Sequence, residues 1–296
     1  MKKNINVLVV QNFITEDNPN INRERVKSLI HESIQANNIN PDLILLPEFF
    51  TGPPWYFPNK KHLQGLIDET IPGETTNFFS HIAQKYKTHI VCGSLVEKED
   101  DKYFNTSTLI GPNGDIIGKY RKVHRYASEI GNIEAGDNFP VFETEIGRIG
   151  IALCSDFWIM EVPRILSLKG ADIIVVPANS LKQNINVTIE AILGASVLNA
   201  TPIIYSSSIN HISGLRNGRI VNIDFEGHSC IVTPKGVLSK AGTEETVLIG
   251  NLDMEFMHKL KQVDVMQTET ISWGITGRRP ELYQLLTNNP SCNCNH

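Results

Sequence analysis

The sequence has few cysteines, no long apolar run and no large excess of charge. Its five cysteines are odd in number and irregularly spaced, which does not fit a disulfide framework and favours a reducing cytoplasm. The apolar stretch Ile5–Val10 is interrupted at Gln11 and Asn12, too soon for a signal peptide. No run approaches the ~18 apolar residues of a membrane helix. We therefore expect a cytoplasmic protein with no membrane partner.

Composition and charge limit the class of protein further. Hydrophobic residues make up 41% of the 296 residues and charged residues 20%, enough for a sizeable core. The net charge of −5 comes from interspersed acidic and basic residues, which argues against nucleic acid as the main partner. The length allows two small domains or one large one. Because no Pro-, Gly- or Ser-rich linker divides the chain, we predict one domain over residues 1–287 and a polar, disordered tail over 288–296.

Short β-branched runs alternate with stretches of helical periodicity, which predicts a layered α/β protein. The predicted strands are Ile5–Val10, Leu43–Leu46, His89–Ser94, the hairpin Ser107–Ile110 and Ile116–Tyr120, Arg148–Leu153, Ala171–Val176, Ile203–Ser207 and further strands between Gly227 and Leu252. The predicted helices begin at about Asn22, as an N-cap, and cover Glu74–Tyr86, Ile159–Lys169 and Ile189–Asn199.

Three of the apolar strands end at a residue that does not suit a strand. These residues are Glu48, Cys154 and Asn179. In layered α/β proteins the crevice beyond the strand ends is where sites are built. A cysteine on a strand-to-helix turn can also have its thiolate stabilised by the helix N-terminus. The alternative for Cys154 is a small buried hydrophobe.

Glu48 and a basic segment are the other candidates for chemistry. A carboxylate beside four apolar residues risks burial, and a buried carboxylate needs a partner or a raised pKa. Glu48 is therefore a candidate general base, although it could instead cap a helix or pair with a lysine. Lys122 lies in the basic segment Lys119–His124, which follows the hairpin; the alternative for this segment is a solvated run of charge.

Taken together, these segments resemble the nitrilase (carbon–nitrogen hydrolase) superfamily over about residues 5–285. That family places its glutamate in Leu-Pro-Glu, which is Leu46–Glu48 here, and its lysine in Tyr-Arg-Lys-x-His, which is Tyr120–His124 here. Its cysteine begins a Cys-x-Asp segment with a later Arg, here Cys154–Arg164. Members often carry a second glutamate about seven residues before a glycine. Glu129 has that place before Gly136, and Glu134 is a competing candidate.

The sequence also departs from the family pattern. Met160 replaces the usual proline before the glutamate of the cysteine segment, and Glu129 follows His124 by fewer residues than is common, which should reshape one wall of the pocket. Trp158 completes a Cys-x-Asp-x-Trp form that resembles carbamoylputrescine-type and some aliphatic amidase branches. The resemblance therefore favours amides over nitriles as substrates.

The resemblance implies a fold, a mechanism and a set of partners. The fold would be a single-domain, four-layer α-β-β-α sandwich that commonly forms homodimers or larger homo-oligomers. Cys154 would attack a small amide or N-carbamoyl compound, with Glu48 as general base, Lys122 and the backbone N–H of Ser155 holding the oxyanion, and Glu129 orienting Lys122 or the substrate nitrogen. This chemistry requires no metal or organic cofactor, although Cys292, Cys294 and His296 could bind a metal. The predicted pocket residues are Trp55, Tyr56, Trp158, Asn179 and His211.

Three alternatives stay open at this point. An amide synthase or acyltransferase would use the same thioester with an amine in place of water. A nitrile hydrolase would use the same nucleophile on a different carbon. An inactive binding scaffold is the last alternative, and the retention of Glu48, Lys122 and Cys154 counts against it.

Overall fold

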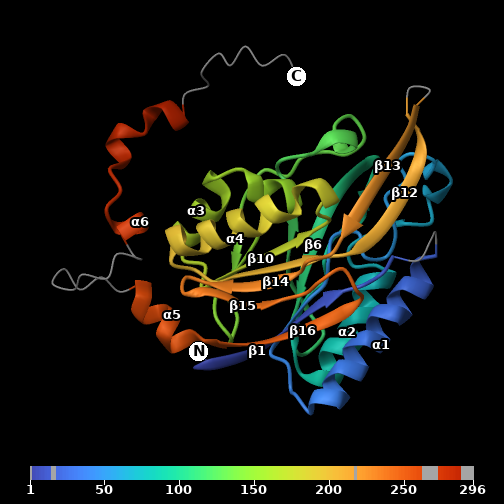
Figure 1. Ribbon diagram of the computed structural model, residues 1–296. Helices are drawn as coiled ribbons and strands as arrows, with labels where there is room; N and C mark the ends of the chain where they lie inside the picture. Colours follow the sequence, from blue (N-terminus) through green and yellow to red (C-terminus); the bar gives the residue numbers. More distant parts are fainter. Residues whose placement is uncertain (1, 15–17, 217–218, 262–272, 288–296) are drawn as a thin grey trace.

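Two β-sheets face each other in the computed structural model, with helices on their outer sides (Figure 1). The structure describes residues 2–14, 18–216, 219–261 and 273–287. The predicted tail over 288–296 and its two cysteines lie outside these residues. None of the helices within them is long and apolar enough to cross a membrane.

The larger sheet is built mainly from the first half of the chain. Its strands are, in spatial order, β16 (Thr246–Asp253), β1 (Asn4–Gln11), β2 (Leu43–Leu45), β4 (His89–Val91), β6 (Lys102–Ile110), β5 (Leu95–Glu99) and β3 (Asp68–Glu69), with β7 (Ile116–Arg121) also paired to β6. Strands β1, β2 and β4 are parallel, and β6 is antiparallel to both β4 and β7. Strands β2, β4 and β7 therefore point the same way, and their carboxyl ends meet at one edge.

The second sheet and the helices come from the segments between and after these strands. Its spatial order is β15 (Gly236–Lys240), β14 (Cys230–Thr233), β11 (Ile203–Ser207), β10 (Ile173–Ala178), β9 (Ile149–Ile151) and β8 (Val141–Phe142). The helices are α1 (Pro19–Asn37), α2 (Glu74–Tyr86), α3 (Glu161–Leu168), α4 (Ile185–Asn199), α5 (Met254–Lys261) and α6 (Trp273–Thr276).

The hydrophobic core has three layers. One lies between the two sheets, one between the larger sheet and helices α1 and α2, and one between the second sheet and helices α3 and α4. Because side chains alternate along a strand, Val7 and Val9 of β1 face the second sheet, whereas Leu8 and Val10 pack with α1 and α2. The third cluster joins β10 and β11 to α3 and α4, for example through Ile174 and Ile192. The predicted α-β-β-α sandwich is therefore confirmed.

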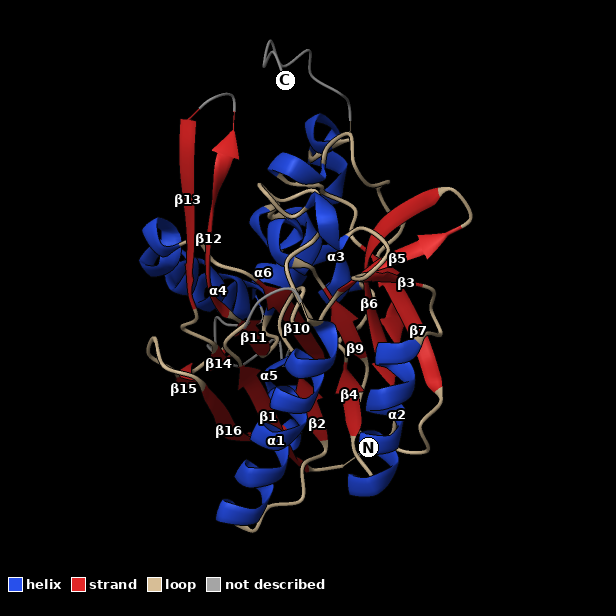
Figure 2. Cartoon of the chain, turned by 90° about the vertical axis from the view of Figure 1, so that its right-hand side faces the viewer, coloured by secondary structure: helices blue, strands red, loops and turns tan. Residues whose placement is uncertain are grey.

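The fold differs from the predicted elements at several places: β3, β5, β8 and α5 were not predicted, and α4 begins at Ile185, before its predicted start at Ile189. Helix α1 begins at Pro19 and is capped by Asn18, whose side chain accepts from the backbone N–H of Asn20 and Ile21, so the N-cap predicted at Asn22 is wrong. An antiparallel ribbon of β12 (Ile209–Arg216) and β13 (Arg219–Glu226) was not predicted. It belongs to neither large sheet and projects beyond them (Figure 2).

Candidate active site

The predicted glutamate lies just past β2, in a loop that a glycine helps to shape. Leu46 donates its N–H to Val91 at 3.1 Å, and Phe49, directly after Glu48, donates to Ser94 at 3.1 Å. Gly93 has φ +38°, and a Cβ there would lie 2.0 Å from the Pro47 carbonyl oxygen. Only glycine fits this approach, so the loop after β4 can hold Glu48 in place.

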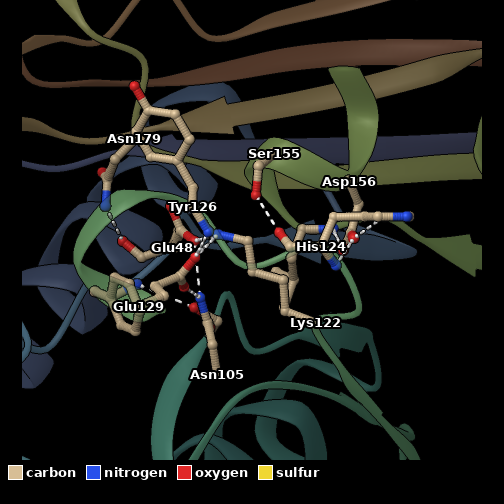
Figure 3. A network of polar contacts seen from close by, with 12 residues as sticks. Glu48, Asn105, Lys122, His124, Tyr126, Glu129, Ser155, Asp156 and Asn179 are labelled. Atoms are coloured by element: carbon tan, nitrogen blue, oxygen red, sulfur yellow. Dashed lines mark hydrogen bonds and ion pairs between the residues drawn. The ribbon is translucent and has the colours of Figure 1, made fainter. Parts of the chain in front are cut away.

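Lys122 follows β7 and meets two carboxylates in a buried cluster. Its Nζ lies 3.0 Å from Oε1 of Glu48 and 2.9 Å from Oε2 of Glu129. Each of the three residues is only 3% exposed. Figure 3 shows the lysine side chain pointing at both carboxylates. The sequence suggested that a buried Glu48 would need a partner. Lys122 is that partner, because its ammonium lies within contact distance of both carboxylates.

Asn105 is a member of this cluster that the sequence did not identify as a site residue. From β6 its Nδ2 donates to Glu48 at 2.9 Å and to Glu129 at 2.7 Å. Its backbone carbonyl accepts from the Lys122 N–H at 2.9 Å. A single asparagine therefore spaces the two carboxylates and anchors the strand end that carries the lysine.

Glu129, not Glu134, is the second glutamate that reaches the lysine. Its Oε2 also accepts the backbone N–H of Tyr126 at 2.7 Å, whereas Glu134 is exposed. Gly136, which marked Glu129 in the sequence, donates its N–H to the Lys122 carbonyl at 2.8 Å. A Cβ at this glycine would lie 2.1 Å from the Arg121 carbonyl oxygen. The glycine therefore lets the loop that carries Glu129 close against the lysine strand.

Cys154 is separated from the end of β9 by two residues and begins a five-residue 3₁₀ helix, η3 (Cys154–Trp158). Its φ of +44° lies in the left-handed region, which costs of order 1–3 kcal/mol for a residue with a side chain. Asp156 fixes the turn: its Oδ2 accepts from the Leu153 N–H at 3.2 Å and from the Tyr120 hydroxyl at 2.6 Å. Strain held by several contacts is frequent at functional sites.

The turn of Cys154 is also tied to the segment that carries Lys122. Oδ1 of Asp156 lies 2.8 Å from the His124 backbone nitrogen and 2.9 Å from its Nδ1. Ser155 donates its hydroxyl to the His124 carbonyl at 2.5 Å. Only Val123 lies between Lys122 and His124, so these bonds fix the lysine relative to the cysteine (Figure 3).

Burial and the neighbouring charges set the protonation of the cluster. Burial raises the pKa of Glu48, and Lys122 offsets only part of that rise. Burial alone would lower the pKa of Lys122, but Glu48 and Glu129 raise it well above its usual value. Burial and the Glu48 carboxylate raise the pKa of the Cys154 thiol. Burial therefore opposes the stabilised thiolate that the strand-to-helix turn suggested, and the helix that follows Cys154 is only a five-residue 3₁₀ helix.

Asn179, at the end of β10, links the nucleophile to the glutamate. Its Nδ2 donates to the Glu48 carbonyl at 2.9 Å, and its Oδ1 accepts from the Ser208 hydroxyl. A hydrogen bond from its backbone to the sulfur lowers the pKa of Cys154, although by less than burial raises it. Glu48, Cys154 and Asn179, which follow β2, β9 and β10, are thus brought together, as expected for residues beyond the strand ends of a layered α/β protein.

The other predicted pocket residues are spread more widely. Tyr56 is half-buried and lies in the field of the cluster, with Trp55 packed against it at 5.4 Å between ring centroids. Trp158 is 46% exposed at the end of η3, and His211 pairs with Asp224 across β12–β13. Neither makes a polar contact with the buried cluster within the described chain, so their place in the pocket stays a prediction.

Comparison with known proteins identifies carbon–nitrogen hydrolases as relatives of this chain. A family model described as Carbon-nitrogen hydrolase matches residues 7–262. The omega-amidase NIT2 of Xenopus tropicalis is 29% identical over 253 residues, which cover 81% of this chain and 86% of that protein. A protein named nitrilase from Pyrococcus abyssi is 33% identical over 241 residues, covering 80% of this chain and 85% of that one.

Solved structures share the fold over nearly the full length. The carbon-nitrogen hydrolase from Helicobacter pylori G27 superposes with a TM-score of 0.83 at 24% identity, covering 96% of this chain and 98% of that one. An amidase from Nesterenkonia sp. superposes with a TM-score of 0.74 at 20% identity, covering 97% and 98%. At these identities the likeness concerns the fold.

Proposed function

The chain is an enzyme of the carbon–nitrogen hydrolase family, and we propose that it hydrolyses a small amide or N-carbamoyl compound through a thioester on Cys154. The observation that carries the proposal is the buried cluster of Glu48, Lys122 and Glu129 beside a strained cysteine. That cluster supplies a base, a cation and a nucleophile at one strand edge.

In the first half of the reaction Cys154 is acylated. Glu48 takes the proton of the thiol as Sγ attacks the carbonyl carbon, which is required because burial keeps the resting thiol protonated. The oxygen that gains charge is held by the Lys122 ammonium and the Ser155 N–H. The C–N bond then breaks, and Glu48 passes its proton to the nitrogen, which leaves as ammonia or an amine.

In the second half water replaces the amine. Glu48, again a carboxylate, takes a proton from water as the water oxygen attacks the thioester carbon, and the C–S bond breaks. The acid leaves and the thiol recovers its proton. Glu129 keeps Lys122 in place through its 2.9 Å contact, and the lysine charge allows the two carboxylates to stay ionised so close together. This scheme uses no cofactor.

The substrate class is tested by matched pairs in which one acyl group is presented as an amide, an N-carbamoyl compound and a nitrile. An amide places its developing negative charge on oxygen beside Lys122, whereas a nitrile places it on nitrogen along the C≡N axis. We expect kcat/KM, measured by ammonia release, to be higher for the amides. A nitrile that equals its amide across several pairs would overturn the choice of substrate.

The alternative, an amide synthase, uses the same thioester with an amine as acceptor. Product analysis with and without an added amine separates the two reactions. Release of the free acid, unchanged by the amine, supports hydrolysis. Formation of a new amide at the expense of the acid supports acyl transfer.

We also propose that two copies associate through the outer face of α3 and α4, which lie side by side (Figure 1). Exposed apolar side chains gather there: Leu168 is 46% exposed, Val187 57% and Leu198 52%. Helix α4 carries a single charged residue, Glu190, in 15 positions, whereas a solvated face is usually charged. Sedimentation of wild-type protein and of Val187→Glu tests this: we expect a dimer that the substitution weakens. A monomeric wild type would refute the proposed dimer.

A cytoplasmic location stays a prediction from the number and spacing of the cysteines.

A further inference from the structure

Tyr56 has a buried hydroxyl that makes no hydrogen bond with any residue that the structure describes. The indole Nε1 of the adjacent Trp55 is also buried and also lacks a hydrogen-bond partner among the described residues. Other buried tyrosines are paired: Tyr120 donates to Asp156 at 2.6 Å, and Tyr205 is bonded to Ser180. The segment after Glu48 therefore contains two neighbouring polar groups that are buried and make no hydrogen bond with the described residues.

An unsatisfied buried hydroxyl costs free energy, and such groups in native proteins usually serve a ligand or an ordered water. The place of Tyr56 favours a ligand. Its phenol lies in the electric field of Glu129, Lys122 and Glu48, the charges that would surround the reacting amide. Burial and Glu129 raise the pKa of Tyr56 well above its usual value, so the hydroxyl stays neutral and can both donate and accept.

The ring that carries this hydroxyl is held by other aromatic rings. Phe49, Trp55 and Phe57 pack edge-on against it, with ring centroids at 6.4, 5.4 and 5.7 Å. Edge-to-face packing of this kind restricts rotation and fixes the direction of the ring. A hydroxyl whose position is fixed in advance loses little entropy when it binds a ligand.

We propose that the Tyr56 hydroxyl is a substrate-binding group, which forms a hydrogen bond to the polar end of the amide bound between Lys122 and Cys154. The bond satisfies the phenol when substrate arrives and helps to orient the carbonyl carbon toward the sulfur. This inference rests on the proposed amide hydrolysis. It assigns to Tyr56 a contact with the substrate and no part in proton transfer.

The test is Tyr56→Phe, which removes only the oxygen, with kinetics on an amide and thermal unfolding measured on the same preparations. Loss of one neutral hydrogen bond should lower kcat/KM about three- to tenfold. Because the bond forms on binding and persists, we expect most of the loss as a higher KM with kcat nearly retained. Because the hydroxyl has no protein partner, the Tm should be unchanged or higher.

Tyr120→Phe is the matched control, since its hydroxyl is paired with Asp156 and its removal should lower the Tm. Unchanged kinetics in Tyr56→Phe, with an active wild type, would overturn the inference and leave the proposed hydrolysis standing. A lower Tm in Tyr56→Phe would overturn it too, because the hydroxyl would then be structural. A wild type that turns over no amide would refute the proposed function and this inference with it.

Discussion

Replacing Lys122 with Met is the perturbation whose consequences the structure specifies most fully. Methionine keeps the length and apolar stem of the side chain but removes the only cation in contact with Glu48 and Glu129 among the described residues. The cluster changes from two negative charges and one positive to two negative charges, all at 3% exposure. Removing one partner of a buried ion pair costs about 3–5 kcal/mol.

The pH dependence of that loss follows from the carboxylates left behind. Without the lysine, burial and repulsion from the Glu129 carboxylate raise the folded-state pKa of Glu48 further above its unfolded value. The folded variant then binds more protons than the unfolded chain, so its stability increases as the pH falls through the raised pKa. We therefore expect the deficit of Lys122→Met, measured by urea denaturation against wild type, to be largest near neutral pH and to shrink toward pH 5.

Two further variants separate stability from chemistry. Lys122→Met combined with Glu129→Gln restores the net charge of the cluster and should recover part of the stability, while kcat stays ~10²–10³-fold or more below wild type. Lys119→Met is the control on β7, just before Lys122. It removes one of two cations that contact Glu97, and because Arg121 stays in contact with that carboxylate it should cost less stability than Lys122→Met. A stable Lys122→Met protein would refute the electrostatic argument, and recovered activity in the double variant would remove the lysine from the mechanism.

Three other predictions concern the same site. Cys154→Ala should abolish turnover, whereas folded Cys92→Ala and Cys230→Ala should keep it, because Glu48 and Lys122 act on the Cys154 thiol and on neither of the other two; equal loss in all three would contradict this. The acid limb of the kcat/KM profile should lie above 4.5, the ordinary pKa of Glu, since falling pH protonates a Glu48 whose pKa is raised; a limb at or below 4.5 would count against it as the base. Asn105→Ala should lower kcat/KM about 10–100-fold and move that limb to higher pH, because its hydrogen bond lowers the pKa of Glu48; an unmoved limb would show that the bond does not act on the base.

The parts of the fold that sequence predicted well are those with strong local signals. Helix α2 has the predicted bounds Glu74–Tyr86, since an amphipathic pattern fills it from end to end. The ribbon of β12 and β13 escaped prediction because polar and glycine residues interrupt its apolar positions and it joins neither large sheet. For α1, the proline at the first position was the overlooked signal of an earlier start.

Some residues of the site could also be predicted from local sequence signals, and others could not. Glu48 and Cys154 stood out because each ends an apolar strand with a residue that a strand does not favour. Asn105 did not, because an asparagine inside a strand gives no sign of which loops fold over it. Its role arises from pairing between β6 and β7 and from the loop that carries Glu129. The rise in the Cys154 pKa was equally hidden, since burial depends on both sheets and not on the sequence around the cysteine.

Whether Cys154 carries the acyl group is measured most directly by mass spectrometry of acid-quenched enzyme during turnover of an amide. Peptides from the quenched protein are compared with those of enzyme mixed with the product acid. The mechanism predicts a peptide containing Cys154 whose mass is raised by the acyl group in place of one hydrogen, formed within a single turnover and absent in Cys154→Ala. Steady hydrolysis of the amide by Cys154→Ala, or an acyl group found only on another residue, would contradict it.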